Sequence, residues 1–559
     1  MNINEEYNIW LQHTADNQEL HQELVAMQNK KAQIEDAFYC ELAFGTAGLR
    51  GVMGAGTNRM NSYIVARASQ GVANYLKQNQ AQPAVVIGYD SRNNSRKFAE
   101  ITAAVFAANG IKVHIWPELM PVPTVSFATR YLNAAAGIMI TASHNPAKYN
   151  GYKVYGEDGC QITTEAANSI LAEINKLDIF KDVKKADFQT ALASKQISYI
   201  DDAVYNVFLK EVKQQSVLFG EKVQKDAAIV YTPLNGTGLK PVTQILVEAG
   251  YTNIKIVPEQ KLPDGNFPTC PYPNPELAEA LKLGIEYART NNADLLLATD
   301  PDCDRVGIAV RDEHDEYQIL TGNQVGVLLL DYICSQRSKH HQMPEAAVMI
   351  KTVVTTAMAE QIAQSYGVRT INVLTGFKYI GEQIGLLEQK GMAGNYIFGF
   401  EESCGYLSGY YVRDKDGVNA AYLICEMYSY YSTQGVSILQ KLAELYKKHG
   451  YSINLTCSYE FDGSTGLAKM QQIMNNLRQG VAELAGKKVI SVLDYAGGIN
   501  GLPEENMLQF TLEDKCSVIV RPSGTEPKLK TYIYAIGESE AQAEQIAEDL
   551  IASSKELLK

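Results

Sequence analysis

One order of local elements occurs three times along the 559-residue chain. Each copy has a short apolar run, a polar turn, a segment closed by Gly, and a second apolar run. The copies begin at residues 84, 227 and 346. Strand–helix–strand units of this kind need right-handed crossovers and form parallel or mixed sheets, with functional groups at the carboxyl ends of the strands. The repetition therefore predicts three α/β domains.

The first copy is the clearest. Its helical segment carries Phe98, Ile101 and Val105 at spacings of three and four residues, which is typical of a helix with one buried face. The expected strands of the three copies are residues 84–88 and 111–115, 227–231 and 254–257, and 346–350 and 370–373. A further helix is predicted before the apolar run 294–298, with Asn274 as its cap, Pro275 in its first turn, and Leu277, Leu281, Ile285 and Ala288 facing inward.

The last hundred residues have a different pattern. A strand-like run at 517–520, a loop at 521–528 and the alternating run 529–534 indicate neighbouring strands, and a helix is expected from about Ser539. The predicted fold class is α/β, with three similar mixed-sheet α/β domains and a C-terminal α+β domain. The expected boundaries are 1–204, 205–322, 323–448 and 449–559.

Composition narrows the classes of function. Asp and Glu number 63 and Lys and Arg 50, so the formal charge is −13, which disfavours nucleic acid and anionic membranes as partners. The chain has no long apolar run and no signal-peptide pattern at its start. Its nine cysteines contain no C-x-x-C pair, which argues against a disulfide framework or a zinc site and favours a reducing cytoplasm.

Two loops that follow apolar strands carry candidate reactive groups. The first is Thr141-Ala142-Ser143-His144-Asn145-Pro146, where Ser143 is a potential nucleophile held at a strand end; the alternative is an ordinary turn. The second is Asp300-Pro301-Asp302-Cys303-Asp304-Arg305. Three carboxylates on alternate residues repel one another unless a cation neutralises them, and all-oxygen ligation favours Mg²⁺ over Ca²⁺ or Mn²⁺. A solvated acidic turn is the alternative.

Two further loops carry candidate binding groups. Gly399-Phe400-Glu401-Glu402-Ser403 combines carboxylates with a hydroxyl, as recognition of vicinal sugar hydroxyls requires, although a carboxylate pair at a helix start would look the same. The loop from Arg521 to Lys528 joins Arg, hydroxyl groups and Gly, which can surround a phosphate. A plain hairpin turn is the alternative there.

Taken together, the four loops resemble those of the α-D-phosphohexomutase family. The resemblance extends from Gly45-Thr46-Ala47-Gly48-Leu49-Arg50-Gly51 to the 521–528 loop, nearly the whole chain. The family fold has three similar α/β domains and a fourth α+β domain around a central cleft. The resemblance implies reversible phosphoryl transfer between glucose 1-phosphate and glucose 6-phosphate. Glucose 1,6-bisphosphate would be the intermediate and activator, and Mg²⁺ the metal.

The resemblance also implies roles for individual residues. Ser143 matches the phosphoserine nucleophile and fourth metal ligand beside the triad of aspartates. Four residues match family positions near the transferring phosphoryl group: Arg50, His144, Lys153 and Arg305. The resemblance does not show which of them is the general acid or base. Substrate contacts match Lys378, Glu401, Ser403, Arg521, Ser523, Gly524 and Thr525.

Alternatives remain open for both the sugar of the substrate and the class of protein. Phe377-Lys378 matches the glucose-specific pattern of the family, whereas Phe400 replaces a glycine of many members, so a pentose or mannose phosphate stays open. A Mg²⁺-dependent phosphatase with an aspartyl nucleophile at Asp300 is a second class, and a non-catalytic sugar-phosphate sensor a third. A small sugar phosphate is the expected partner, and a monomer or weak homodimer the expected state.

Overall fold

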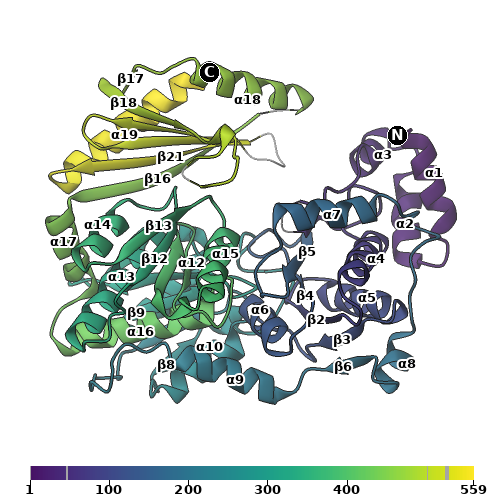
Figure 1. The fold of residues 1–559 in the computed structure, drawn as a ribbon, viewed down its shortest axis with the longest axis horizontal. Coiled ribbons are helices and arrows are strands. Elements are labelled where there is room, and N and C mark those ends of the chain that lie inside the picture. Colours follow the sequence, from purple (N-terminus) through teal and green to yellow (C-terminus); the bar gives the residue numbers. More distant parts are fainter. Residues whose placement is uncertain (1, 46–47, 462, 500, 523–527, 559) are drawn as a thin grey trace.

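The computed structural model describes residues 2–45, 48–461, 463–499, 501–522 and 528–558. Its described part contains four sheets, and each sheet falls in one of the four predicted regions. The predicted fold class is confirmed. Three α/β units come first, and an antiparallel α+β unit ends the chain (Figure 1).

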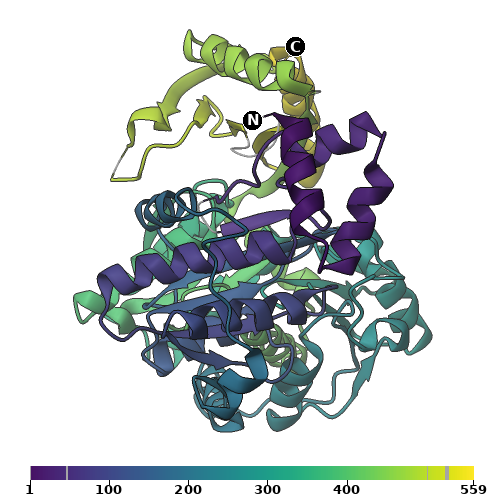
Figure 2. The ribbon, with the colours of Figure 1, turned by 90° about the vertical axis from the view of Figure 1, so that its right-hand side faces the viewer.

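The first unit has a mixed six-stranded sheet in the order β1-β5-β4-β2-β3-β6. Helices α1–α3 precede it and pack on its outer side, where Trp10 and Phe38 are fully buried (Figure 2). The elements are α1 Ile3–His13, α2 Gln18–Met27, α3 Lys31–Phe38, β1 Gly48–Val52, α4 Ser62–Asn79, β2 Ala84–Tyr89, α5 Ser95–Ala108, β3 Lys112–Ile115, α6 Val122–Tyr131, β4 Ala136–Ile140, β5 Tyr149–Gly156, α7 Thr164–Ile174, α8 Phe188–Ala193 and β6 Ile197–Tyr199.

The second unit has a mixed five-stranded sheet in the order β11-β10-β9-β7-β8. Strands β9 and β10 pair antiparallel, so the loop between them leaves the sheet at the carboxyl end of β9. The elements are α9 Asp202–Lys213, β7 Ile229–Thr232, α10 Leu239–Glu248, β8 Ile254–Ile256, α11 Pro258–Lys261, α12 Ala278–Thr290, β9 Leu295–Thr299, β10 Val306–Arg311 and β11 Tyr317–Leu320.

The third unit has a mixed four-stranded sheet in the order β13-β12-β14-β15. Its helix α16 begins after Asp416, whose carboxylate accepts hydrogen bonds from the N–H groups of Val418 and Asn419. The elements are α13 Gly322–Lys339, β12 Val348–Thr352, α14 Met358–Ser365, β13 Arg369–Val373, α15 Phe377–Gln389, β14 Tyr396–Glu401, β15 Gly405–Leu407, α16 Gly417–Thr433 and α17 Ile438–His449.

The fourth unit is an antiparallel six-stranded sheet in the order β16-β21-β20-β19-β18-β17 with helices α18 and α19. Ser539 caps α19, as the sequence predicted. The elements are β16 Tyr451–Glu460, α18 Gly463–Arg478, β17 Glu483–Leu484, β18 Lys487–Asp494, β19 Leu508–Leu512, β20 Ser517–Pro522, β21 Lys528–Gly537 and α19 Glu540–Leu557.

The repeated unit of the sequence is confirmed in all three α/β sheets. In each copy the two predicted strands lie side by side and parallel: β2 with β3, β7 with β8, and β12 with β13. The helix predicted from Asn274 is wrong at its start. Asn274 Oδ1 accepts the N–H of Glu276 in a turn, α12 begins only at Ala278, and Leu277 is 39% exposed. The asparagine caps a turn here, and the helix follows it.

The first three units are joined more closely to one another than to the fourth. One continuous core contains side chains of all three, such as Phe127, Phe208 and Tyr411, whose rings are in contact. The antiparallel unit has its own core and lies above the third unit in Figure 1. Among the described residues, no helix combines the length and the apolar character needed to cross a bilayer.

Candidate active site

Ser143 lies in the loop between β4 and β5, three residues after β4 ends. Its φ angle is +51°, a left-handed conformation that residues other than glycine adopt rarely and that is concentrated at functional sites. The hydroxyl donates a hydrogen bond to Asp300 Oδ2 over 2.8 Å and lies 3.1 Å from His144 Nδ1. Two strand ends from different units therefore bring the predicted nucleophile to the predicted acidic loop.

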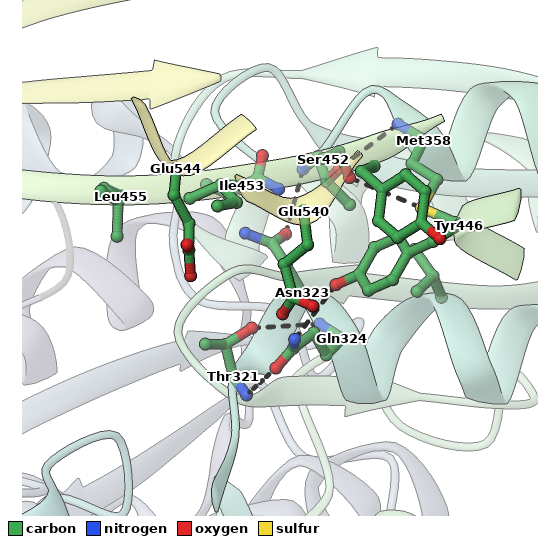
Figure 3. Close-up of a pocket in the computed structure, with 14 residues that line it drawn as sticks. Thr321, Asn323, Gln324, Met358, Tyr446, Ser452, Ile453, Leu455, Glu540 and Glu544 are labelled. Atoms are coloured by element: carbon green, nitrogen blue, oxygen red, sulfur yellow. Dashed lines mark hydrogen bonds between the residues drawn. The ribbon is translucent and has the colours of Figure 1, made fainter. Parts of the chain in front are cut away.

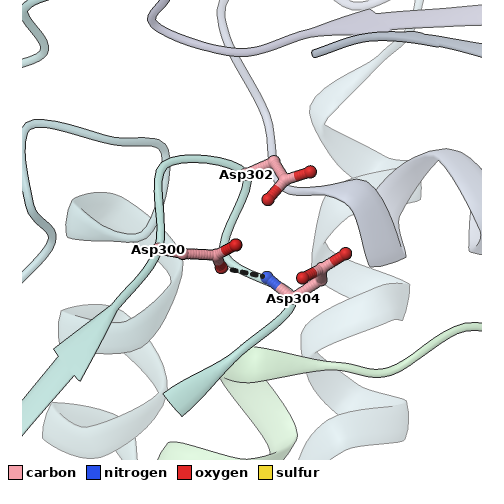
Figure 4. A group of neighbouring side chains, drawn as sticks. All are labelled: Asp300, Asp302 and Asp304. Carbon is pink, nitrogen blue, oxygen red and sulfur yellow. Dashed lines mark hydrogen bonds between the residues drawn. The ribbon is translucent and has the colours of Figure 1, made fainter. Parts of the chain in front are cut away.

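The acidic loop connects β9 to β10, and its three carboxylates gather in one place (Figure 4). Ligand atoms of Asp300, Asp302 and Asp304 all lie within 4.8 Å of one another, and the three side chains are buried. Asp300 Oδ1 accepts the N–H groups of Asp304 and Arg305, at 3.1 and 3.0 Å. The turn therefore fixes the direction of Asp300 through its own backbone.

Electrostatics of the triad indicate that a cation belongs there. Burial and the charges of the other two aspartates raise the pKa of Asp300 well above its ordinary value. Burial also opposes ionisation of Asp302, yet Lys153 holds the pKa of that carboxyl below its usual range. One oxygen each of Asp302 and Asp304 is buried without a hydrogen-bond partner in the described part of the chain. Unpaired carboxylate oxygens, all hard donors, fit a divalent metal of the Mg²⁺ type.

Two lysines from different units contact the triad. Lys153, on β5, lies 2.9 Å from Asp302 Oδ2 and 3.4 Å from Asp304 Oδ2. Lys415, just before α16, lies 3.0 Å from the same oxygen of Asp304. Burial opposes the charge of both lysines, but the aspartates raise the pKa of each above its ordinary value. All three α/β units thus contribute charge to one centre.

Arg305, His144 and Arg50 surround the same centre. Arg305 Nε lies 3.9 Å from Asp304 Oδ1, and its Nη1 pairs with Glu276. Burial and the charges of Arg305 and Arg50 lower the pKa of His144 well below 6.5. Arg50, on β1, donates to Asn145 Oδ1 over 3.1 Å. The structure thus brings together the groups that the family resemblance matched to positions near the transferring phosphoryl.

The loop after β14 approaches this centre from the third unit. Glu401 is 6% exposed, and burial raises the pKa of its carboxyl although Lys415 and Arg305 oppose the rise. Ser403 lies two residues further along the same turn and is half-buried. Phe400 is fully buried, and its ring fills the space that a Cβ on Gly326 of α13 would need. This phenylalanine faces the core and not the site.

Two predicted phosphate-binding cations, Lys378 of the third unit and Arg521 of the fourth, lie close enough for their charges to interact. Arg521 Nε donates to Glu505 Oε1 over 2.9 Å. Burial lowers the pKa of Lys378, on which the charges of Glu505 and Arg521 also act. The Lys378 ammonium lies 4.7 Å from the ring centroid of Tyr379. Ser523, Gly524 and Thr525 lie outside the described residues.

Several residues of the site are not among those predicted from the sequence. Lys415 belongs to the run Arg413-Asp414-Lys415-Asp416, a cluster of four charges before a helix that could have been noticed. Asp90 and Arg92 belong to the polar turn after the first repeated strand, where the sequence shows no sign of their role. Glu505 has no local signal, because its partners come from other strands and helices.

A cavity of about 230 Å³ separates the third and fourth units (Figure 3). The start of α13, strand β16 and helix α19 line it. Gln324 Nε2 donates to the Tyr446 hydroxyl over 3.0 Å in this lining, to which Glu540 and Glu544 also belong. A smaller cavity of about 80 Å³ lies beside it and reaches Glu402. The junction between these two units is therefore incompletely filled.

Four family models match consecutive segments of the chain. All are described as phosphoglucomutase/phosphomannomutase: α/β/α domain I at residues 41–180, domain II at 206–313, domain III at 321–449, and the C-terminal domain at 462–553. Because these matches cover most of its length, the chain belongs to the phosphoglucomutase/phosphomannomutase family of enzymes, the α-D-phosphohexomutases.

Particular members of the family narrow the comparison. The phosphoglucomutase of Staphylococcus haemolyticus is 36% identical over 511 residues, 89% of this chain and 91% of that protein. The phosphoglucomutase of Staphylococcus saprophyticus is 36% identical over 536 residues, 94% and 95% of the two chains. The open form of Paramecium parafusin, a phosphoglucomutase, has a TM-score of 0.70 at 18% identity over 93% of this chain and 95% of its own. A family protein of Burkholderia thailandensis has a TM-score of 0.68 at 18% identity over 92% and 97%.

Proposed function

We propose that this chain interconverts α-glucose 1-phosphate and glucose 6-phosphate through a phosphorylated Ser143 and glucose 1,6-bisphosphate. The observation that carries the proposal is the contact of the Ser143 hydroxyl with Asp300, one of three buried carboxylates that lie together. Three cations lie beside these carboxylates: Lys153, Lys415 and Arg305. Phosphoryl transfer needs positioning and neutralisation of charge above all. Relatives that align with nearly the whole chain are phosphoglucomutases.

The proposed reaction has two transfers. In the first, the phosphorus of phospho-Ser143 forms a bond to the free sugar hydroxyl oxygen, the bond to Ser143 Oγ breaks, and the hydroxyl proton passes to a group of the site. The bisphosphate then turns round in the cleft. In the second, Ser143 Oγ takes the other phosphoryl group, and the released sugar oxygen receives a proton.

Asp300, Asp302, Asp304 and the phosphate on Ser143 would hold Mg²⁺. Bound there, the ion would neutralise charge on the phosphoryl oxygens during transfer. Lys153, whose ammonium already faces two of the carboxylates, would supply a fixed positive charge on the same side. Arg305 and Arg50 would add charge from the rim, and His144 Nδ1 lies within reach of the serine oxygen.

The far end of the substrate would be bound by the other two loops. Glu401 and Ser403 would accept and donate hydrogen bonds to the sugar hydroxyls. Lys378 and Arg521 would pair with the phosphate that does not react, because both are cations grouped around one carboxylate. Glucose is the favoured sugar because the relatives are phosphoglucomutases. Phe400 does not argue against glucose, because its side chain is buried and would not contact the sugar.

The test is a pair of measurements on the full-length protein. Mass spectrometry of its peptides should find phosphate on Ser143, and kcat/KM with Mg²⁺ and glucose 1,6-bisphosphate should be higher for glucose 1-phosphate than for mannose 1-phosphate or ribose 1-phosphate. A Ser143→Ala variant should lose turnover. Phosphate on Asp300 with release of inorganic phosphate would replace the proposal by a phosphatase, and a ribose value tenfold above the glucose value would change the substrate.

We also infer a reducing cytoplasmic setting and a monomer or weak homodimer. All nine cysteines are free, including buried ones such as Cys303 and Cys425, which supports a reducing compartment. Sedimentation at micromolar concentration checks the oligomeric state.

A further inference from the structure

Arg92 is a fully buried arginine outside the set of residues that would touch the substrate. It lies in the turn between β2 and α5, and its side chain has no exposure to solvent. A buried guanidinium is costly unless its N–H groups are bound and its charge is paired. Groups next to Ser143 bind both terminal nitrogens, and Asp90 pairs with the charge beside Nε, which has no hydrogen-bond partner among the described residues.

Arg92 binds the carbonyl groups of the loop that carries the nucleophile. Nη1 donates to the carbonyls of Pro146 and Tyr149, at 3.0 and 3.1 Å. Nη2 donates to the carbonyls of Ser143 and Asn145. These four acceptors follow one another from the nucleophile to the first residue of β5. One planar guanidinium therefore fixes the whole loop, which a single ammonium could not span.

Asp90 extends the same network to the backbone of Ser143. Its carboxylate lies 3.4 Å from Arg92 Nε and accepts the Thr141 hydroxyl over 2.6 Å. Thr141 Oγ1 in turn accepts the N–H of Ser143 over 2.8 Å. The left-handed φ of Ser143 is unfavourable alone. Hydrogen bonds to both its N–H and its carbonyl hold that conformation in place.

The second unit covers the outer side of this clamp. The Phe267 ring lies 5.0 Å from the Arg92 guanidinium, a cation–π contact. Asn93 donates to Asn266 Oδ1 over 2.9 Å, and a Cβ on Gly265 would come within 2.3 Å of the Asn93 backbone nitrogen. The unit that supplies Asp300 thus also holds the arginine that orients Ser143.

We propose that Arg92 is the positioning residue of the nucleophile. With Asp90, it holds the Ser143 loop so that the serine hydroxyl lies within hydrogen-bond distance of Asp300. The proposal rests on the proposed function, because it assigns a purpose to the geometry of Ser143. Arg92 touches neither reacting group, so its loss should lower the rate of phosphoryl transfer and leave substrate affinity nearly unchanged. Misplacement of a reacting group by about 1 Å can cost roughly a hundredfold in rate.

The experiment compares Arg92→Ala and Arg92→Lys with Arg96→Ala. Arg96 lies four residues away, its side chain is 67% exposed, and it forms an exposed ion pair with Glu100 on the same helix, so it is a matched control. We expect kcat to fall about a hundredfold in Arg92→Ala and about tenfold in Arg92→Lys, with KM within about threefold of the parent. Arg96→Ala should behave as the parent.

Two further readouts separate positioning from general stability. Guanidinium chloride at a non-denaturing concentration should restore part of the kcat of Arg92→Ala, whereas tetramethylammonium chloride should not. Incubation with glucose 1,6-bisphosphate should phosphorylate Ser143 more slowly in both Arg92 variants than in Arg96→Ala, as followed by mass spectrometry.

Several results would overturn the proposal. A folded Arg92→Ala enzyme with kcat within threefold of the parent would do so, as would a loss confined to KM. If neither Arg92 variant folds, the arginine serves stability and the proposal is wrong. If the parent protein itself has neither phosphate on Ser143 nor mutase turnover, the proposed function fails, and the positioning role falls with it.

Discussion

The two ends of the proposed cleft differ in how deeply most of their cations are buried, although Arg50 at the reacting end is exposed. At the reacting end, Arg92 and Lys153 are nearly or fully buried and have several fixed partners each. At the far end, Arg521 is 27% exposed and pairs with Glu505, which is 25% exposed. Charge that must stabilise a transition state is most effective when it is already in place. A group that must release and rebind a phosphate as the bisphosphate turns needs no such rigidity.

The joints between the units follow the same division. Glu388 on α15 pairs with Arg413 of its own unit and with Arg130 of the first unit, and Arg413 is fully buried. A shared core continues across the first three units. The fourth unit instead meets the third through a small apolar cluster that includes Val354, Leu374 and Tyr532, with two cavities in the same joint (Figure 3). The unit that carries Arg521 thus shares a smaller apolar cluster with its neighbour than the first three units share with one another, which suits closure on a substrate.

The largest expected effect is at the triad. Asp302→Asn removes one carboxylate oxygen that lacks a partner and weakens the pairing with Lys153. We expect kcat/KM to fall by about a hundredfold or more and the Mg²⁺ concentration for half-maximal rate to rise. Asp315→Asn, on the exposed turn after β10, is the control and should change neither. Equal kinetics for the two variants would exclude the triad as the metal centre.

Much of the reacting end was predictable because strand ends meet at sheet edges. The apolar runs before Ser143 and Asp300 become β4 and β9, and the two residues then come within 2.8 Å. Lys415 and Arg92 were not predictable as partners of that centre. Their contacts span sequence separations that no local pattern encodes, and buried charges near a turn look like surface charges in a sequence.

The sequence misplaced the start of α12 and left the position of Phe400 open for two different reasons. Asn274 and Pro275 form a helix-start signal, but the asparagine caps a turn and the helix begins only at Ala278. Phe400 alternates with Glu401 along β14, so the phenylalanine faces the core when the carboxylate faces the site. The sequence alone did not indicate which of the two faces was buried.

A second prediction tests what a buried charge costs at the rigid end. Burial raises the pKa of Asp416 to about 6, although the Tyr411 hydroxyl and two N–H groups favour the ionised form. A raised pKa gives stability that is complete below the unfolded value and lost as pH rises through about 6. Relative to Asp416→Asn, the free energy of unfolding of the parent should therefore fall by about 2 kcal/mol between pH 4 and pH 7. Urea midpoints measured in parallel check this, and a difference that is constant with pH would contradict it.

A third prediction contrasts Arg521 with Arg92. Arg521→Ala should raise KM for glucose 1-phosphate by about ten- to a hundredfold, the value of a charge-assisted hydrogen bond to phosphate, with kcat changed only a few-fold. Arg478→Ala in the same unit, which removes a pair with Asp494 and a hydrogen bond to Asn506, is the matched control. If Arg521→Ala lowered kcat as strongly as Arg92→Ala, the two ends would not differ in the way their charges are used.

The smallest expected effect concerns Glu505, the carboxylate around which the far-end cations gather. A glutamine there can still accept the hydrogen bond from Arg521 Nε, but it no longer neutralises Arg521 and Lys378. The site becomes more positive, so Glu505→Gln should lower KM for glucose 1-phosphate about threefold and strengthen inhibition by sulfate, more at low salt than at high salt. Glu504→Gln, one residue away, should alter neither value. A higher KM in Glu505→Gln would mean that Arg521 needs the carboxylate charge to hold its orientation, and the far end would then be built as rigidly as the reacting end.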